Sequence, residues 1–297
     1  MLGARSFSSP IGSTIHPGGS NCTKGTARTH RKHALRRSQQ AAGAHQLPSA
    51  QAAESAPAPS KGTCFLVGGG LGPVDHLTVK AAKLLQSAEV CVYDDLGAQG
   101  PLELLPPSCE RVYVGKRGGK QSIKQPDIDR ILVELCSQGR NVIRLKGGCP
   151  SVFSRVSSEM TALTAAGCPY EFVPGISSAL AAPLMAGFPL TQAHIGTAFA
   201  VTSGHDLDQN WAAFAAIPTL VVLMAGRTLP QIGRKLLDVS WAPDTHVCIV
   251  RSAGTSEQQI WHMSLASVIA DPPKEDLSPC IVVFGNVARL GLHDGSV

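Results

Sequence analysis

The chain has 297 residues, of which 43% are hydrophobic, and this length is enough for one large core or two smaller ones. Its formal net charge of +5 comes from the start of the chain: residues 1–60 hold seven of the 26 basic residues and one of the 21 acidic residues, so the remainder carries −1. A nearly neutral fold lacks the positive surface that nucleic-acid binding needs, and no apolar run reaches the roughly 20 residues of a membrane span.

Residues 1–60 are rich in Ser, Ala, Thr, Arg and Gly and contain a single acidic residue, Glu54. They have no continuous apolar core of the kind that a secretory signal needs. This composition predicts an organelle transit peptide, although a disordered basic tail has the same features. In either case we expect the fold to begin after residue 60.

The first part of the fold alternates short apolar runs with helical periodicity. The predicted strands are 63–67, 90–93, 111–114, 141–145 and 170–173. The predicted helices are about 77–88, a helix opened by Pro126 and closed by Gly139, and 159–166. Strands that alternate with helices in this way predict a mostly parallel sheet covered by helices.

The second part repeats the alternation more loosely. Its predicted strands are 199–202, 220–224, 247–250, 259–262 and 281–284, and its predicted helices are 229–237 and 265–270. The break falls in the Pro- and Gly-rich stretch 174–196. We therefore predict two α/β domains, 61–174 and 175–297, with a ligand cleft between them.

The nine cysteines are scattered, and none forms a CxxC pair or another metal-ligand spacing. They are interpreted as thiols in a reducing compartment, and no metal site is predicted.

Three glycine-rich turns each follow a predicted strand, where glycine lets the backbone approach a ligand closely. A further turn of this kind, VGGGLGPVD after the first predicted strand, taken alone resembles a dinucleotide-binding turn, with Asp94 at the end of the next strand. Pro73 stands where that fingerprint has its third glycine. A nicotinamide-dependent oxidoreductase is therefore one hypothesis for the function.

The three turns that follow it along the chain have the sequences VGKRGGKQSIKQ, RLKGGCPSVFSR and VPGISSALAAPLMAGFPLT. This combination resembles the tetrapyrrole methylases, and in particular those members that methylate uroporphyrinogen III. The resemblance implies transfer of methyl groups from S-adenosylmethionine to C-2 and C-7 of the macrocycle, without a metal. It also implies a homodimer, and it favours the chloroplast stroma, because plants and algae make sirohaem in plastids.

The same resemblance assigns roles to residues. Asp94 matches the family's proton acceptor and Lys116 its proton donor. The residues that match cofactor-binding positions are Leu71, Gly147, Gly148, Cys149, Val152, Ser177, Ser178, Met224 and Gly254. Simpler roles are open for several of them: Ser177 and Ser178 could cap a helix, Met224 could be a buried strand residue and Gly254 could form a turn.

The chain departs from the family pattern at Leu71, Pro73, Cys149, Ser151 and Ser154, where the family has Pro, Asp, Asp, Phe and Gly. These departures motivate a further hypothesis, a weakened homologue that binds tetrapyrrole or cofactor without efficient turnover.

The acetate and propionate groups of the substrate need basic partners. The candidates are Lys116, Arg117, Lys120, Lys124, Arg144, Lys146 and Arg155.

Overall fold

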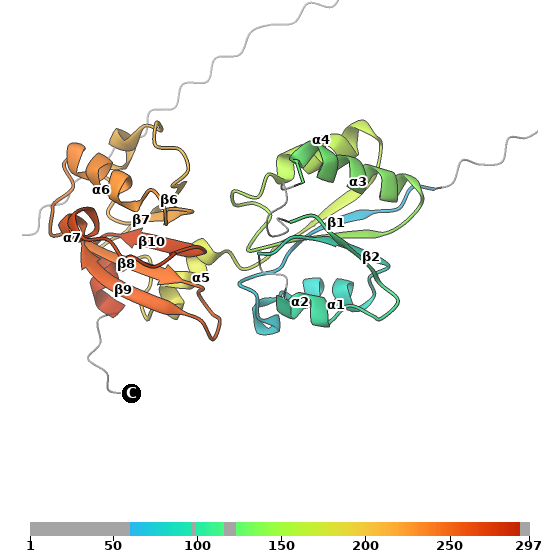
Figure 1. Ribbon diagram of the computed structural model, residues 1–297, viewed down its shortest axis with the longest axis horizontal. Coiled ribbons are helices and arrows are strands. Elements are labelled where there is room, and N and C mark those ends of the chain that lie inside the picture. Colours follow the sequence, from blue (N-terminus) through green and yellow to red (C-terminus); the bar gives the residue numbers. More distant parts are fainter. Residues whose placement is uncertain (1–59, 97–98, 116–122, 292–297) are drawn as a thin grey trace, which may run out of the picture. The chain divides into compact units, whose positions relative to one another are not determined.

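A computed structural model describes residues 60–96, 99–115 and 123–291. The predicted leader lies outside these residues except for Ser60, and Lys116 lies outside them as well. The domain boundaries proposed above therefore stay predictions, but the folded region contains two separate five-stranded sheets (Figure 1).

The first sheet has the strand order β3-β2-β4-β1-β5, and every neighbouring pair in it is parallel. Its strands are β1 (Cys64–Gly68), β2 (Val90–Tyr93), β3 (Glu110–Tyr113), β4 (Val142–Lys146) and β5 (Tyr170–Val173). The sequence predicted all five strands to within two residues at each end, because each is a short apolar run bounded by turn residues.

Helices cover both faces of this sheet, with α1 and α2 on one side and α3 and α4 on the other (Figure 1). Their bounds are α1 (Val79–Gln86), α2 (Gln99–Glu103), α3 (Gln125–Ser137) and α4 (Val156–Ala165), and a short 3-10 turn, η1 (Val74–His76), precedes α1. Successive strand residues point to opposite faces. Leu66 accordingly packs with Leu132 of α3, whereas Val67 packs with Leu85 of α1.

Because the strands are parallel, their carboxyl ends all lie at one edge of the sheet, and the loops that follow them gather there. In open α/β sheets this edge is where ligands bind. Asp94 follows β2, Gly147 follows β4 and Gly175 follows β5. The fold therefore places Asp94 and the glycine-rich turns after β4 and β5 at the edge where a site is expected.

The second sheet has the order β6-β7-β10-β8-β9, in which β6 and β7 are parallel and the other neighbouring pairs antiparallel. Its strands are β6 (Ala200–Ser203), β7 (Leu220–Leu223), β8 (His246–Arg251), β9 (Gln259–Ser264) and β10 (Cys280–Phe284). Its helical elements are α5 (Ser178–Met185), α6 (Leu229–Asp238), α7 (Leu265–Ala270), η2 (Trp211–Phe214) and η3 (Asn286–Gly291).

Two hydrophobic clusters stabilise the second sheet, one on each face. Leu220 and Phe284 pack with Ile232 of α6 on one face, and Val221 packs with Ala182 of α5 on the other. The second α/β unit is therefore confirmed, and its sheet is mixed. Helices α2 and α5 were not predicted as elements.

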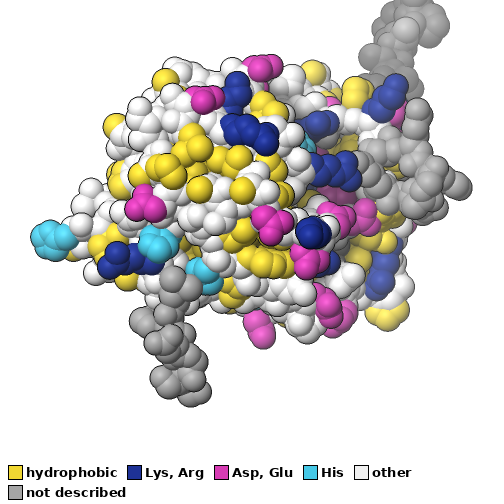
Figure 2. All heavy atoms as spheres, turned by 60° about the vertical axis from the view of Figure 1, so that its left-hand side comes forward, with side chains coloured by type: hydrophobic (Ala, Val, Ile, Leu, Met, Phe, Trp, Pro, Cys, Tyr) yellow, Lys and Arg dark blue, Asp and Glu magenta, His cyan; other side chains and the backbone are white. Residues whose placement is uncertain are grey.

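Basic and acidic side chains occur together on the face shown in Figure 2, among hydrophobic ones. Within the described residues, no helix is long and apolar enough to cross a membrane.

Candidate active site

Three loops meet backbone to backbone at the carboxyl edge of the first sheet. A Cβ added at Gly68 would lie 2.6 Å from the carbonyl oxygen of Gly148 and 2.6 Å from Cα of Gly175. The amide of Gly148 also donates to the carbonyl of Gly70 at 2.8 Å. Contacts this close exclude a side chain at Gly68 and at Gly175, so glycine at the end of β1 and after β5 allows these loops to pack together.

Gly148 leaves an opening among these packed loops. Its φ is +68°, in the left-handed region, and a Cβ built there would meet no atom closer than 4.0 Å, the nearest being backbone atoms of Ser177 and Ser178. The neighbouring Gly147, in contrast, would clash with the carbonyl oxygen of Leu96, at 2.6 Å. The Gly148 backbone thus borders open space that a side chain would fill, as expected where a ligand approaches a backbone closely.

Asp94 follows β2 at the same edge. Its side chain is 30% exposed, and its Oδ2 accepts a hydrogen bond from Nη2 of Arg144 at 2.9 Å. No hydrogen bond to its Oδ1 is found among the residues that the structure describes. Asp94 therefore presents a fixed and accessible carboxylate, as a proton acceptor needs.

Arg144 and Lys146 were considered as substrate-binding residues, but the structure buries both. Their side chains are 3% and 4% exposed, and each donates to Oε1 of Glu159, Arg144 Nε at 3.0 Å and Lys146 Nζ at 2.7 Å. Neither cation is free to pair with a substrate carboxylate. Of the described candidates, Lys124 and Arg155 are exposed.

The two buried cations differ in their electrostatics. Burial lowers the pKa of Lys146, repulsion from Arg144 lowers it further, and Glu159 opposes both effects. Burial also acts to lower the pKa of Arg144, but the attraction of Glu159 and Asp94 outweighs it, so this pKa is raised. Sequence reasoning missed Glu159 as a functional candidate. The sequence did contain a signal: Arg144 and Lys146 alternate with apolar residues in a central strand. Cations buried in this way need an anionic partner elsewhere in the chain.

Cys149 is partly buried in the loop after β4, and its Sγ lies 3.0 Å from Oγ of Ser151. Burial acts to raise the pKa of this thiol, but hydrogen bonds from Ser151 and from the backbone of Gly175 outweigh burial and lower it. The amide of Val152 donates to the carbonyl of Cys149 at 3.1 Å, which closes the turn.

Ser177 and Ser178 start helix α5. The hydroxyl of Ser177 accepts from the amide of Ala179 at 3.3 Å, so Ser177 is the N-cap, as one of its two interpretations predicted. Its predicted contact with the cofactor stays a prediction, as does that of Ser178, the first residue of the helix.

Met224 is not a buried strand residue, because β7 ends at Leu223 and Met224 is 38% exposed with a φ of +59°. A left-handed conformation costs a residue with a side chain about 1–2 kcal/mol, and such strain is concentrated at functional sites. Gly254 has a φ of +75°, which confirms the predicted turn. A Cβ built on Gly254 would lie 3.0 Å from Cδ1 of Leu71, so these two predicted cofactor residues lie close together.

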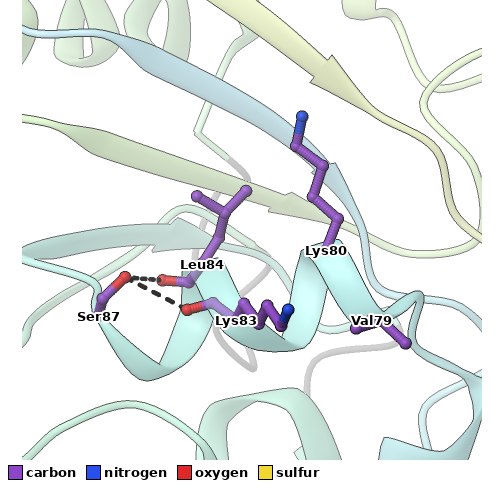
Figure 3. Close-up of a pocket in the computed structure, with 5 residues that line it drawn as sticks. All are labelled: Val79, Lys80, Lys83, Leu84 and Ser87. Carbon is purple, nitrogen blue, oxygen red and sulfur yellow. Dashed lines mark hydrogen bonds between the residues drawn. The ribbon is translucent and has the colours of Figure 1, made fainter.

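A surface hollow in Figure 3 is lined by residues of helix α1 and Ser87 beside it: Val79, Lys80, Lys83, Leu84 and Ser87. It contains none of the predicted site residues. Within the described part of the chain, no cluster of three or more His, Cys, Asp or Glu side chains could hold a metal ion.

The strand order argues against the dinucleotide-binding hypothesis. In that architecture the acidic residue ends a strand directly beside the one that carries the glycine turn. Here β4 lies between β1 and β2, and the Asp94 carboxylate is paired with Arg144. The position of Asp94 therefore differs from the one that binds ribose.

The fold and site together define a two-sheet α/β protein with glycine-lined loops and an accessible carboxylate. The family model of the Tetrapyrrole (Corrin/Porphyrin) Methylases matches residues 63–269. The chain belongs to this family.

Two curated relatives and one solved structure define its place in the family more closely. The chain is 45% identical over 230 residues to a uroporphyrinogen-III C-methyltransferase from Synechococcus elongatus, which covers 77% of this chain and 95% of that protein. It is 37% identical over 253 residues to a siroheme synthase from Azotobacter vinelandii, covering 83% of this chain and 54% of the relative.

A crystal structure of uroporphyrin-III C-methyl transferase from Thermus thermophilus, complexed with S-adenyl homocysteine, superimposes with a TM-score of 0.69. The two proteins are 35% identical, and the match covers 77% of this chain and all of the other.

Proposed function

We propose that this chain is a methyltransferase that uses S-adenosylmethionine to methylate uroporphyrinogen III at C-2 and C-7, which gives precorrin-2 for sirohaem synthesis. The observation that carries the proposal is the carboxyl edge of the first sheet. There the fold places the accessible carboxylate of Asp94 at the same edge as the open backbone of Gly148. In support, the Synechococcus elongatus relative is named uroporphyrinogen-III C-methyltransferase, and the Thermus thermophilus structure is that of a uroporphyrin-III C-methyl transferase.

The chemistry needs an anion and an ordered cofactor. S-adenosylmethionine supplies the methyl group: the π electrons of a pyrrole carbon form the new C–C bond while the C–S bond breaks, and its electron pair stays on sulfur as S-adenosylhomocysteine. The methylated ring is then cationic and becomes neutral when it loses a proton. The Asp94 carboxylate stabilises this cation and accepts the proton.

The residues present fit the cofactor. The opening beside Gly148 is bordered by the backbone of Ser177 and Ser178, so backbone amides and carbonyls can serve polar groups of a ligand. Cys149 provides no carboxylate where the family has aspartate, so the loop depends on the backbone of Gly147 and Gly148 for its contacts. Val152, Leu71, Met224 and Gly254 complete the proposed set.

The test is an anaerobic incubation of the full chain with uroporphyrinogen III and S-adenosylmethionine, followed by mass spectrometry of the macrocycle. The proposal predicts the addition of two methyl groups to each ring. Binding of S-adenosylhomocysteine without methylation would instead support the weakened homologue that the departures at Leu71 and Cys149 suggest. Binding of NAD in place of S-adenosylhomocysteine would support the oxidoreductase.

Three finer points belong to the same proposal. Residues 1–60 direct import into the chloroplast stroma, which fusion of this segment to a fluorescent protein would test. The enzyme is a homodimer, which sedimentation equilibrium would test. Lys116, three residues after β3 in the sequence, serves as the proton donor, and Lys124 and Arg155 are the described candidates for binding the substrate carboxylates.

A further inference from the structure

A cluster of ion-paired side chains extends from the Asp94 carboxylate into the protein interior. It consists of Arg144 and Lys146 of β4, Glu159 of α4 and Asp94 itself. The side chains of Arg144, Lys146 and Glu159 are 3%, 4% and 0% exposed, whereas that of Asp94 is 30% exposed. The cluster thus has three buried members and one that reaches the surface at the proposed site.

The guanidinium of Arg144 is held at all three of its nitrogens. Nε donates to Glu159 at 3.0 Å, Nη1 donates to the carbonyl of Leu145 at 2.8 Å, and Nη2 donates to Oδ2 of Asp94 at 2.9 Å. Nη1 also lies 3.5 Å from the carbonyl of Val92, two residues before Asp94. Because the guanidinium is planar, the hydrogen bonds at Nε and Nη1 also fix the direction in which Nη2 donates to Asp94.

Glu159 makes this arrangement possible. Two adjacent buried cations would repel each other, and the single oxygen Oε1 of Glu159 accepts from both. A buried charge is tolerated when it is paired and hydrogen-bonded, so Glu159 keeps Arg144 charged and in place. The second oxygen, Oε2, is buried and finds no partner among the described residues. Because Glu159 is buried and paired with both cations, Asp94 is the carboxylate of this cluster that solvent and a substrate can reach.

We propose that Arg144, clamped by Glu159, is a positioning residue for the methyl transfer: it fixes the orientation of the Asp94 carboxylate through Oδ2 and leaves Oδ1 to act on the substrate. Neither Arg144 nor Glu159 contacts the reacting atoms. The inference rests on the proposed function, because it assigns Arg144 an effect through Asp94.

The critical variant is Arg144→Lys, which keeps the buried positive charge but has one nitrogen in place of three. We expect kcat for methyl transfer to fall about 10²-fold, the order of loss that a misplaced catalytic group produces. The affinity for S-adenosylhomocysteine should stay within about twofold of wild type, because Arg144 is not in the cofactor loop. The matched control is Arg140→Lys, since Arg140 forms an exposed pair with Glu110 at 2.6 Å and should tolerate the same exchange without loss of kcat.

A double-mutant cycle separates positioning from general damage to the fold. Arg144→Lys is measured alone and together with Asp94→Asn, in single turnovers with labelled S-adenosylmethionine. If Arg144 acts through Asp94, its replacement should change the residual rate of the Asp94→Asn enzyme by less than about threefold. Glu159→Gln, which keeps an oxygen acceptor but removes the charge, should behave in the same non-additive way and serves if Arg144→Lys fails to fold.

Two results would overturn the inference: a folded Arg144→Lys enzyme with unchanged kcat, or an equal loss in both backgrounds. Either would leave the proposed function intact. A wild-type protein that binds S-adenosylhomocysteine and transfers no methyl group would overturn the proposed function, and this inference with it.

Discussion

The opening beside Gly148 yields a sharp prediction for cofactor binding. Alanine at this position has two separate effects. First, the backbone at position 148 has a φ of +68°, which costs a residue with a Cβ about 1–2 kcal/mol in stability. Its methyl group also enters the space bordered by the backbone of Ser177 and Ser178 at 4.0 Å, where we place the cofactor.

Gly167 provides the matched control, because it has nearly the same φ, +63°, and its Cβ would meet only the flexible end of Lys61 at 3.5 Å. Gly148→Ala and Gly167→Ala should therefore lose similar stability, with Tm lower by roughly 2–8 °C in a fold of this size. Only Gly148→Ala should weaken the binding of S-adenosylhomocysteine. Forcing a methyl group into a filled site costs about 1–3 kcal/mol, a roughly 5- to 150-fold rise in Kd.

Isothermal titration calorimetry with S-adenosylhomocysteine measures this difference, and differential scanning calorimetry checks that the two variants lose comparable stability. Equal affinity of the two variants for the cofactor would refute the reasoning, since it would mean that the space beside Gly148 does not receive the ligand.

Three further predictions concern the leader, the loop cysteine and the buried thiols. Deleting residues 1–60 should leave Tm and cofactor affinity unchanged, and a large fall in Tm would assign this segment to the fold. Iodoacetamide should modify Cys149 before the other described cysteines, which are all buried, and S-adenosylhomocysteine should slow the reaction; equally rapid labelling of buried Cys248 in peptide maps would contradict this. Burial raises the pKa of Cys91 and Cys248 to about 12, so above pH 9 the unfolded chain loses these protons first. The free energy of unfolding, measured by urea titration, should then fall as pH rises from 9, by up to about 1.4 kcal/mol per pH unit for each thiol, and less steeply in Cys248→Ala; the same slope in both proteins would argue against it.

The sequence predicted the strands well because each one is a short apolar run between turn residues. It could not predict that β4 lies between β1 and β2, since strand order depends on how the crossover helices pack. That order matters for function. Asp94 follows β2, which is not a neighbour of β1, so it does not lie beside the glycine turn after β1 as the acidic residue of a dinucleotide-binding site does.

The site was predictable to the extent that it depends on backbone. The glycines after β1, β4 and β5 were recognised as turns, and the structure shows that Gly68, Gly148 and Gly175 touch one another. The side-chain partners were not predictable, because Arg144 and Glu159 are 15 residues apart and meet only when α4 packs on the sheet. Arg144 was therefore considered for the substrate and is instead part of the support for Asp94.

The central claim is that Asp94 carries methyl transfer at the carboxyl edge of the first sheet. The most direct measurement is the turnover of Asp94→Asn with uroporphyrinogen III and labelled S-adenosylmethionine, at saturating cofactor and without oxygen. The account predicts a loss of about 10²–10⁴-fold in turnover, as is typical when a positioned acid or base is removed, with the affinity for S-adenosylhomocysteine unchanged. Full turnover by the Asp94→Asn enzyme would contradict it.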